Sequence, residues 1–318
     1  MLIYLFMAVP KVVKLMRENN YDINHTHFIY PDGILAYLIK KIFRKPYIIT
    51  AHGSDIPGYN PDRFKRLHKL IKPLGKRIIS NSQKIIVPSK NLECLIKKIS
   101  PGVKSIVIPN GINLNKFSSE RLKQKKILVV SRLFERKGIQ YFLQALTGMS
   151  HEFEVNIVGD GPYLGNLKKL SNERNLPVNF LGYLENNSKE LQNLYESSMI
   201  FVFTSESENF PMVLLEAMIA GLAIITTNDT GCAEVVGNSA LLVGSKNSAA
   251  IRESLESLIN HPRLCMDLGK AARKRVEEYF GWDYISLKYI DLYAQIKSNG
   301  FKAQHFAALF AFIFFQFL

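Results

Sequence analysis

Residues 200–218 read IFVFTSESENFPMVLLEAM, and this stretch decides the fold. It opens with an apolar run typical of a buried strand, continues through a short polar loop and closes in an apolar helical pattern. A strand that runs through a loop into a helix is the repeating unit of parallel sheets with helices on both faces. The segment therefore predicts an α/β fold if the same alternation recurs elsewhere.

The alternation does recur, in short runs rich in β-branched residues. The turn residues PNGIN at 109–113 divide these runs into two groups. We therefore predict two Rossmann-like, doubly wound domains over 1–112 and 113–283. A helix at 284–298 is expected to cross back to the first domain, and an apolar tail follows at 299–318. The predicted strands are 22–28, 47–51, 84–87, 105–108, 126–131, 153–158, 178–181, 200–204, 223–226 and 240–243.

The composition, with 47% hydrophobic and 21% charged residues, is that of a globular protein rather than a disordered one. The cysteines, Cys94, Cys232 and Cys265, form neither a CxxC metal pair nor a disulfide ladder, which is typical of a reducing cytoplasm. The apolar opening residues lack the basic flank and small-residue cleavage site of a signal peptide. We therefore expect a cytoplasmic protein.

Positive charge is concentrated in the first third of the chain. Residues 1–113 hold 19 of the 41 Lys and Arg but only 6 of the 27 Asp and Glu. Residues 61–79 form a basic amphipathic helical pattern, which either packs on the core or lies on an anionic membrane as a peripheral element of its inner face. Nucleic acid is not an expected partner, because no aromatic stacking platform accompanies the charge. The apolar stripe of this helix is Phe64, Leu67, Ile71, Leu74 and Ile78.

Two glutamates in the opening stretch are the candidate chemistry. Glu208 lies in the polar loop and Glu216 lies one to two turns into the helix. Their spacing alone is weak, because two solvated charges would give the same pattern by chance. Glu216, however, interrupts an apolar helix, where a carboxylate needs a hydrogen-bonding partner. The two hydroxyls of a ribose can supply one, and the N-terminus of the helix suits a diphosphate.

The stretch resembles the E-x7-E signature of the family 4 glycosyltransferases, retaining enzymes of the GT-B fold. The resemblance implies that Glu208 contacts the transferred sugar and that Glu216 binds the nucleotide ribose. It also implies that backbone N–H groups after Glu208 contact sugar and phosphate. Pro211 has no N–H. The available donors are Asn209, Phe210, Met212 and Val213.

Two cations follow the strand that opens the second domain. Arg132 and Lys137 lie in SRLFERKG, where they can neutralise a departing diphosphate without a metal, although a solvated basic turn is an equally simple explanation. The segment resembles the family's GRL…KG motif, whose Arg and Lys hold the β-phosphate. Gly161 falls in a GxGP-like turn, and Gly182 matches the strand end beside the nucleotide base.

Histidines follow two strands of the first domain. His27 lies in HTHFIYPDG, and His52 and Asp55 lie in HGSDI. A histidine at a strand end is more often structural than catalytic. Both segments resemble family members that assemble cell-surface polysaccharides such as teichuronic acid or exopolysaccharide. In the family the second histidine lies against the donor sugar, which makes His52 the candidate and leaves His27 and Asp55 as weaker ones.

The resemblance covers about residues 20–295. Relatives begin with a strand and a glycine-rich turn, whereas the segment before Asp22 is a single apolar, helix-like run, so we expect the first domain to be truncated. The implied activity is transfer from a UDP- or GDP-sugar to a membrane-associated lipid-linked or polysaccharide acceptor, with retention and without a metal or cofactor. Two alternatives stay open: a nucleotide-sugar-binding remnant impaired in catalysis, and a GT-B sugar-nucleotide epimerase, which the sequence resembles less.

Overall fold

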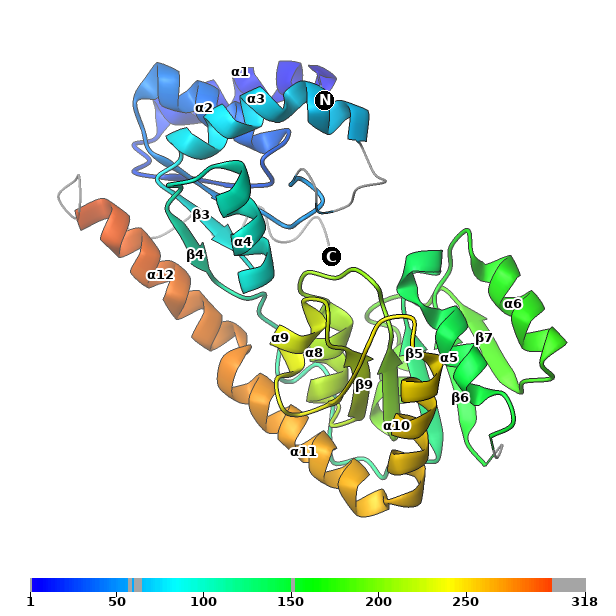
Figure 1. Ribbon diagram of the computed structural model, residues 1–318. Helices are drawn as coiled ribbons and strands as arrows, with labels where there is room; N and C mark the ends of the chain where they lie inside the picture. The colour runs from blue at the N-terminus through cyan, green and yellow to red at the C-terminus, as the bar shows by residue number, and fades with distance from the viewer. Residues whose placement is uncertain (1, 57–58, 60–64, 150–151, 299–318) are drawn as a thin grey trace.

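The computed structural model describes residues 2–56, 59, 65–149 and 152–298, and it contains two parallel sheets, each covered by helices (Figure 1). The first sheet has the strand order β1-β2-β3-β4 and the second the order β10-β9-β8-β5-β6-β7. All of their strand pairs are parallel. The predicted α/β fold with two Rossmann-like domains is confirmed.

The first domain alternates helices and strands from the start of the chain. Its opening helix confirms the helix-like run expected before Asp22, and the predicted basic helix is present from Lys65 onwards. Residues 61–64 of that prediction lie outside the described part of the chain. The elements are α1 (Leu2–Glu18), β1 (Asn24–His27), α2 (Asp32–Phe43), β2 (Tyr47–Thr50), α3 (Lys65–Asn81), β3 (Lys84–Val87), α4 (Lys90–Ile99) and β4 (Ser105–Val107).

The second domain continues the alternation and ends in three consecutive helices. Its elements are β5 (Lys126–Val130), the short η1 (Glu135–Lys137), α5 (Ile139–Leu146), β6 (Glu154–Val158), α6 (Leu164–Glu173), β7 (Val178–Gly182), α7 (Lys189–Ser197), β8 (Ile200–Phe203), α8 (Met212–Ile219), β9 (Ala223–Thr227), α9 (Cys232–Val236), β10 (Leu241–Val243), α10 (Ser248–Asn260), α11 (Pro262–Tyr279) and α12 (Trp282–Ser298). All ten predicted strands are therefore present, with ends that differ by at most two residues.

Several strands, among them β2, β8 and β9, were predictable because they are buried on both faces. In β2, Tyr47 and Ile49 pack on one side of the first sheet against α2, α3 and α4. Ile48, between them, points to the other side and joins Leu292 of α12. The last helix thus runs back along the first sheet (Figure 1). Burial on both faces requires a continuous apolar run, and such runs are what the sequence shows.

One residue of the predicted apolar stripe does not pack as expected. Leu74 of α3 is 38% exposed, whereas Ile78, one turn later, is fully buried. Pro73 lies inside the helix directly before Leu74, and Gly75 after it is buried against Tyr30. The buried face of α3 therefore runs through Gly75 and Ile78 rather than through Leu74. The side chains of the stripe before residue 72 lie outside the described ones.

The surface of the first domain carries exposed apolar residues as well as basic ones. Ile3, Phe6 and Met7 of α1 are 78%, 84% and 60% exposed. Within 2–56, 65–149 and 152–298, no helix is long and apolar enough to cross a bilayer.

Candidate functional site

The carboxyl ends of β5 and β8 bring two of the candidate residues together. These strands are neighbours in the second sheet, so the loops that follow them lie side by side. Lys137, in the first loop, donates a hydrogen bond to Oε1 of Glu208 in the second. Their side chains are 15% and 12% exposed, so the pair is largely shielded from water. Lys137 and Glu208 thus form a neutral unit at the edge of the sheet.

The loop that carries Glu208 is held by backbone contacts. Gly231 donates its N–H to the carbonyl of Glu208 over 2.9 Å, and Glu206 N donates to the carbonyl of Arg136 over 2.8 Å. A Cβ at position 231 would lie 1.8 Å from the carbonyl oxygen of Asn209, so only glycine allows this approach. Gly231, in the segment 230–234, therefore packs directly against the backbone of the Glu208 loop.

The Glu208 loop also reaches the first domain. The side chain of Asn209 is 6% exposed and lies between two loops of that domain. Its Nδ2 donates to the backbone carbonyl of His52 over 3.3 Å, and its Oδ1 accepts from Oγ of Ser89. His52 is therefore brought beside the Glu208 loop, although the two residues are far apart in sequence.

Three histidine rings form a stack at the carboxyl end of β1 and β2. His27 Nδ1 lies 2.9 Å from His52 Nε2, and His25 stacks on His27 with 4.9 Å between ring centroids. His25 is tied further to Thr50 and to Tyr293 of α12, over 2.8 and 2.6 Å. Burial lowers the pKa of His52 and His27 to about 4 and that of His25 to about 3. The stack is therefore neutral at neutral pH.

Asp55 fixes the loop that carries His52. Its carboxylate accepts the N–H groups of Ile29, His52 and Gly53 over 2.8, 3.1 and 3.0 Å. Burial raises the pKa of Asp55, while these three hydrogen bonds act in the opposite direction. Asp55 therefore connects the two histidine loops through their backbone N–H groups. Its carboxylate supports the loops structurally, and we do not assign it a contact with a ligand.

Glu216 has two partners within the protein. Lys116 Nζ donates to Oε1 over 2.6 Å, and the Tyr195 hydroxyl donates to Oε2 over 2.9 Å. The carboxylate is buried in α8, as expected, with 7% of the residue exposed. The buried carboxylate thus has the hydrogen-bonding partners that its burial requires, and both lie within the protein, while its contact with a ribose stays a prediction.

Arg132 lies exposed after β5, with its guanidinium 5.0 Å from the centre of the Phe134 ring. Among the residues that the structure describes, no carboxylate pairs with it. Gly161 holds the same loop, because a Cβ there would lie 2.4 Å from the carbonyl oxygen of Leu133. Gly182 ends β7, and nothing lies within 4 Å of a Cβ placed on it; its position beside a nucleotide base stays a prediction.

The N-terminus of α8 follows the Glu208 loop directly. Pro211 precedes the helix, and no side chain caps the helix there. Phe210 is buried and packs edge-on against Phe280 with 5.5 Å between ring centroids. Met212 and Val213 open the helix, with their N–H groups in its first turn. The backbone donors named from the sequence thus form a single turn of chain beside Glu208.

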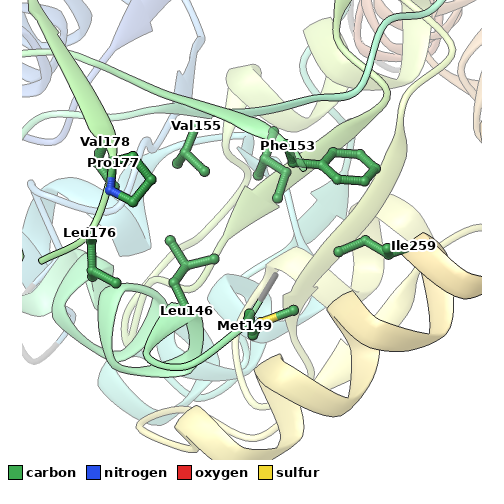
Figure 2. Close-up of a pocket in the computed structure, with 9 residues that line it drawn as sticks. Leu146, Met149, Phe153, Val155, Leu176, Pro177, Val178 and Ile259 are labelled. Carbon is green, nitrogen blue, oxygen red and sulfur yellow. The ribbon is translucent and has the colours of Figure 1, made fainter. Parts of the chain in front are cut away.

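Two other features lie apart from these residues. A small hollow at the amino ends of β5, β6 and β7 is lined by apolar side chains, among them Leu146, Phe153 and Ile259 (Figure 2). It lies at the opposite edge of the sheet from Glu208, and none of the side chains that line it is charged. Across the described residues, no group of three His, Cys, Asp or Glu side chains is placed to hold a metal ion.

The sequence did not reveal Lys116, Tyr195 or Ser89 as parts of this region, nor the contacts that Glu234 makes. Glu234 of α9 accepts the N–H groups of Lys90 and Asn91 at the start of α4, over 2.7 and 2.9 Å. These contacts join residues about 20 to 145 positions apart, so no local pattern contains them. For Lys116 and Tyr195 one signal existed: a carboxylate in an apolar helix requires a counter-charge.

Two parallel domains whose carboxyl edges face each other, with the ion pair and the backbone turn at the junction, have the architecture of the GT-B glycosyltransferases. The family described as "Glycosyl transferases group 1" matches residues 112–275, and the one described as "Glycosyltransferase Family 4" matches residues 2–116. The chain belongs to the group 1 glycosyltransferases, and the resemblance stated from its motifs is confirmed.

Two relatives share about a quarter of their residues with this chain. The putative teichuronic acid biosynthesis glycosyltransferase TuaC of Bacillus subtilis is 27% identical over 263 residues, which are 77% of this chain and 63% of TuaC. N-acetyl-α-D-glucosaminyl L-malate synthase of Bacillus anthracis is 26% identical over 312 residues, 92% of this chain and 80% of that enzyme. The chain thus spans between about three fifths and four fifths of these two relatives.

The fold is also that of a protein whose structure was solved with a nucleotide. HepE of Anabaena, crystallised with UDP, superimposes with a TM-score of 0.78 over 90% of this chain and 82% of HepE, at 17% identity. Identity at this level establishes a shared fold.

Proposed function

We propose that the protein transfers a glycosyl unit from a nucleoside diphosphate sugar, a UDP- or GDP-sugar, to a membrane-associated glycan or lipid acceptor with retention at the anomeric carbon. The observation that carries the proposal is the junction between the domains, where the Lys137–Glu208 pair of the second domain lies one residue from Asn209, which bonds the His52 loop of the first. HepE was crystallised with UDP, which supports a nucleotide donor here.

The charges suit a departing diphosphate. Lys137 is paired with Glu208, whereas Arg132 pairs with no carboxylate among the described residues, and the N-terminus of α8 adds partial positive charge at this edge. Both can stabilise the negative charge that develops as the bond between the sugar and the diphosphate breaks. The cations of the chain, rather than a metal ion, are therefore proposed to hold the leaving group.

The reacting sugar would lie between Glu208 and His52. Glu208 accepts hydrogen bonds from its hydroxyls, and His52, held neutral by burial, contacts the same sugar from the first domain. The acceptor oxygen then bonds to the anomeric carbon from the face that the diphosphate leaves. The departing phosphate takes the acceptor proton, which balances the reaction without a base from the protein.

The donor half is tested by calorimetry with UDP, GDP and their sugars, followed by measurement of donor turnover. Arg132→Ala should lower turnover by about 10- to 100-fold, the range for a lost charge-assisted contact. Arg263→Ala removes an exposed arginine at the start of α11 and should change nothing. Intact turnover in Arg132→Ala would remove Arg132 from the phosphate. Nucleotide binding without transfer or donor hydrolysis would identify a binding remnant, and free or epimerised sugar an epimerase.

The membrane side rests on the surface of the first domain. Lys72 and Lys76 of α3 are exposed, and the exposed apolar residues of α1 belong to the same domain (Figure 1). Each basic residue near an anionic bilayer contributes about 1 kcal/mol. Lys72→Glu with Lys76→Glu should reduce sedimentation with phosphatidylglycerol vesicles, whereas Lys168→Glu with Lys169→Glu on α6 should not. Equal sedimentation of both variants would exclude α3 as the membrane element.

A further inference from the structure

The side chain of Asn209 connects the Glu208 loop to two segments of the first domain. Asn209 follows Glu208 directly, and both ends of its amide are used. Nδ2 donates to the His52 carbonyl over 3.3 Å, and Oδ1 accepts from the Ser89 hydroxyl. Ser89 is fully buried and Asn209 is 6% exposed, so water competes little for either hydrogen bond. The loop of Glu208 is thus tied to the loop of His52 by a shielded amide.

The hydroxyl of Ser89 fixes the orientation of this amide. Leu92 N donates to Ser89 Oγ over 3.2 Å, which caps the N-terminus of α4 and leaves the hydroxyl proton for another acceptor. That acceptor is Oδ1 of Asn209. A carbonyl oxygen can only accept a hydrogen bond, so the His52 carbonyl requires the Nδ2 side of the amide. The two contacts therefore select the same orientation of the Asn209 side chain.

The backbone of His52 is held from both domains. Its N–H donates to Oδ1 of Asp55 over 3.1 Å within the first domain, and its carbonyl accepts from Asn209 of the second. Nε2 of its ring lies 2.9 Å from Nδ1 of His27, also in the first domain. The position of His52 relative to the second domain therefore depends on the Asn209 amide.

The Glu208 loop has a separate support within its own domain. Gly231 donates its N–H to the carbonyl of Glu208 over 2.9 Å, and this contact does not involve the Asn209 side chain. Glu234, which follows in the same segment, accepts the two N–H groups after Ser89 over 2.7 and 2.9 Å. Removal of the Asn209 amide should therefore leave the Glu208 loop in place and release only its link to the first domain.

We infer that Asn209 and Ser89 are positioning residues, which form an interdomain latch with the His52 carbonyl. The latch sets the distance between Glu208 and His52, the two side chains proposed to contact the transferred sugar. This role rests on the proposed transfer from a nucleoside diphosphate sugar. The latch places His52 against a donor that the second domain already holds. Its loss should therefore slow the reaction of bound donor more than it weakens nucleotide binding.

The latch is tested in the full chain by comparing donor turnover with nucleotide affinity. Hydrolysis of a panel of UDP- and GDP-hexoses is measured without acceptor at saturating donor, and UDP and GDP affinities are measured by calorimetry. Asn209→Ala removes both hydrogen bonds and should lower kcat about 10-fold, whereas Ser89→Ala removes one and should lower it about threefold. In both variants the dissociation constants should stay within about twofold of wild type.

A double-mutant cycle shows whether the two residues act together. Asn209→Ala combined with Ser89→Ala should have a kcat within about twofold of that of Asn209→Ala alone, because Ser89 acts on the site through the Asn209 amide. Independent effects would multiply instead, and kcat would fall about 30-fold.

Matched controls separate positioning from damage to the fold. Ser188→Ala removes the N-cap of α7, where Ser188 accepts Leu191 N over 3.2 Å as Ser89 does at α4. Asn172→Ala removes an exposed amide of α6. Both should leave kcat and affinity unchanged. If Asn209→Ala does not fold, Ser89→Ala compared with Ser188→Ala decides alone, because both lose an N-cap and only Ser89 contacts Asn209.

The outcomes distinguish the latch from the proposed function. If turnover and nucleotide affinity fall by the same factor, the two residues merely support the fold, and the inference is overturned. Multiplied effects in the double variant, or full turnover in Asn209→Ala, overturn it as well, while the transfer proposal stands. Wild-type protein that turns over none of the donors contradicts the proposed function, and the latch with it.

Discussion

Single atoms decide much of the geometry at the domain junction. The Glu208 loop, the His52 loop and α9 meet through backbone groups, and the side chains that take part have little freedom. Gly231 and the histidine stack are two places where a change of one residue has a calculable effect. The effect at Gly231 comes from the backbone packed against it, and the effect at the histidines comes from their burial.

Gly231→Ala should disturb the donor site. Its Cβ would lie 1.8 Å from the carbonyl oxygen of Asn209 and 2.9 Å from that of Glu208, so the Glu208 loop must shift. Overpacking of this kind costs about 1–3 kcal/mol, and nucleotide affinity should fall with it. Gly165→Ala in α6, where nothing lies within 4 Å, should instead stabilise the protein by about 0.5–1 kcal/mol. Chemical denaturation and UDP calorimetry measure both variants, and equal behaviour would contradict the assigned contact.

The histidine stack should make stability depend on pH. The folded pKa values of His52 and His27, about 4, lie below the value of 6.5 for an unfolded histidine. The unfolded chain therefore binds more protons below pH 6.5, so the free energy of unfolding should fall as pH decreases from 6.5 towards 4. Each of these histidines should remove on the order of 1–2 kcal/mol by pH 5.

Denaturant unfolding at pH 7, 6 and 5 measures this slope. His27→Gln should make the slope shallower, and His261→Gln, which replaces an exposed histidine of the second domain, is its control. A slope that does not change in His27→Gln would mean that the stack is protonated in the folded protein.

At the scale of elements, the N-terminus of α4 in the first domain contacts Glu234 of α9 in the second. The N-terminus of α4 is capped from within by Ser89, whose Oγ accepts Leu92 N over 3.2 Å, and from the second domain by Glu234. A carboxylate at a helix N-terminus stabilises by about 0.3–1 kcal/mol, and by up to about 2 kcal/mol when partly buried. The contact therefore favours the arrangement in which the domain edges face each other.

Glu234→Gln should weaken this contact, since the amide keeps one acceptor and loses the charge. The nucleotide-free protein should then open more often, which small-angle X-ray scattering would detect as a larger radius of gyration. Glu190→Gln, at an exposed position in the first turn of α7, provides the control. An unchanged radius in Glu234→Gln would show that the cap does not hold the domains together.

The elements themselves were predictable and their mutual contacts were not. Strands such as Tyr47–Thr50 are buried on both faces, so nearly all of their residues are apolar. Such a run can be recognised in one sequence without an alignment. The Glu208 loop was found by the same logic, since it follows such a strand. Lys116, which balances Glu216 from a hundred residues away, belongs to no periodic pattern. Leu74 was misplaced because Pro73 and Gly75 change which face of α3 is buried.

At the scale of the molecule, α12 links the domains as much as the linker does. Ile112 and Gly281 form a β-bridge, so the two chain crossings lie side by side. From there α12 covers one face of the first sheet with Ile285, Leu292 and Tyr293. Asp22 receives a salt bridge of 3.2 Å from Lys297 near the end of this helix. The first domain thus depends on the last described helix of the chain.

Leu292→Ala should destabilise the first domain in particular. Leu292 is 1% exposed, and truncation of such a leucine costs about 2–5 kcal/mol. Differential scanning calorimetry should show an earlier transition for the first domain, while the second domain still binds UDP. Leu287→Ala on the same helix, 58% exposed, should stay within about 0.5 kcal/mol of wild type. Simultaneous melting of both domains in Leu292→Ala would mean that they unfold as one unit.

The return of α12 to the first sheet also sets an order of events during synthesis. All strands of the first domain are translated by residue 107. Ile48, Ile86 and Ile108 are covered by α12, however, and its residues 285–296 are translated much later. The second domain, from Lys126 to Tyr279, completes its sheet and helices in that interval. The domain made first is therefore finished last, and an open face of sheet must wait through more than half of the chain's translation. A chaperone that shields apolar sheet faces would act at this stage.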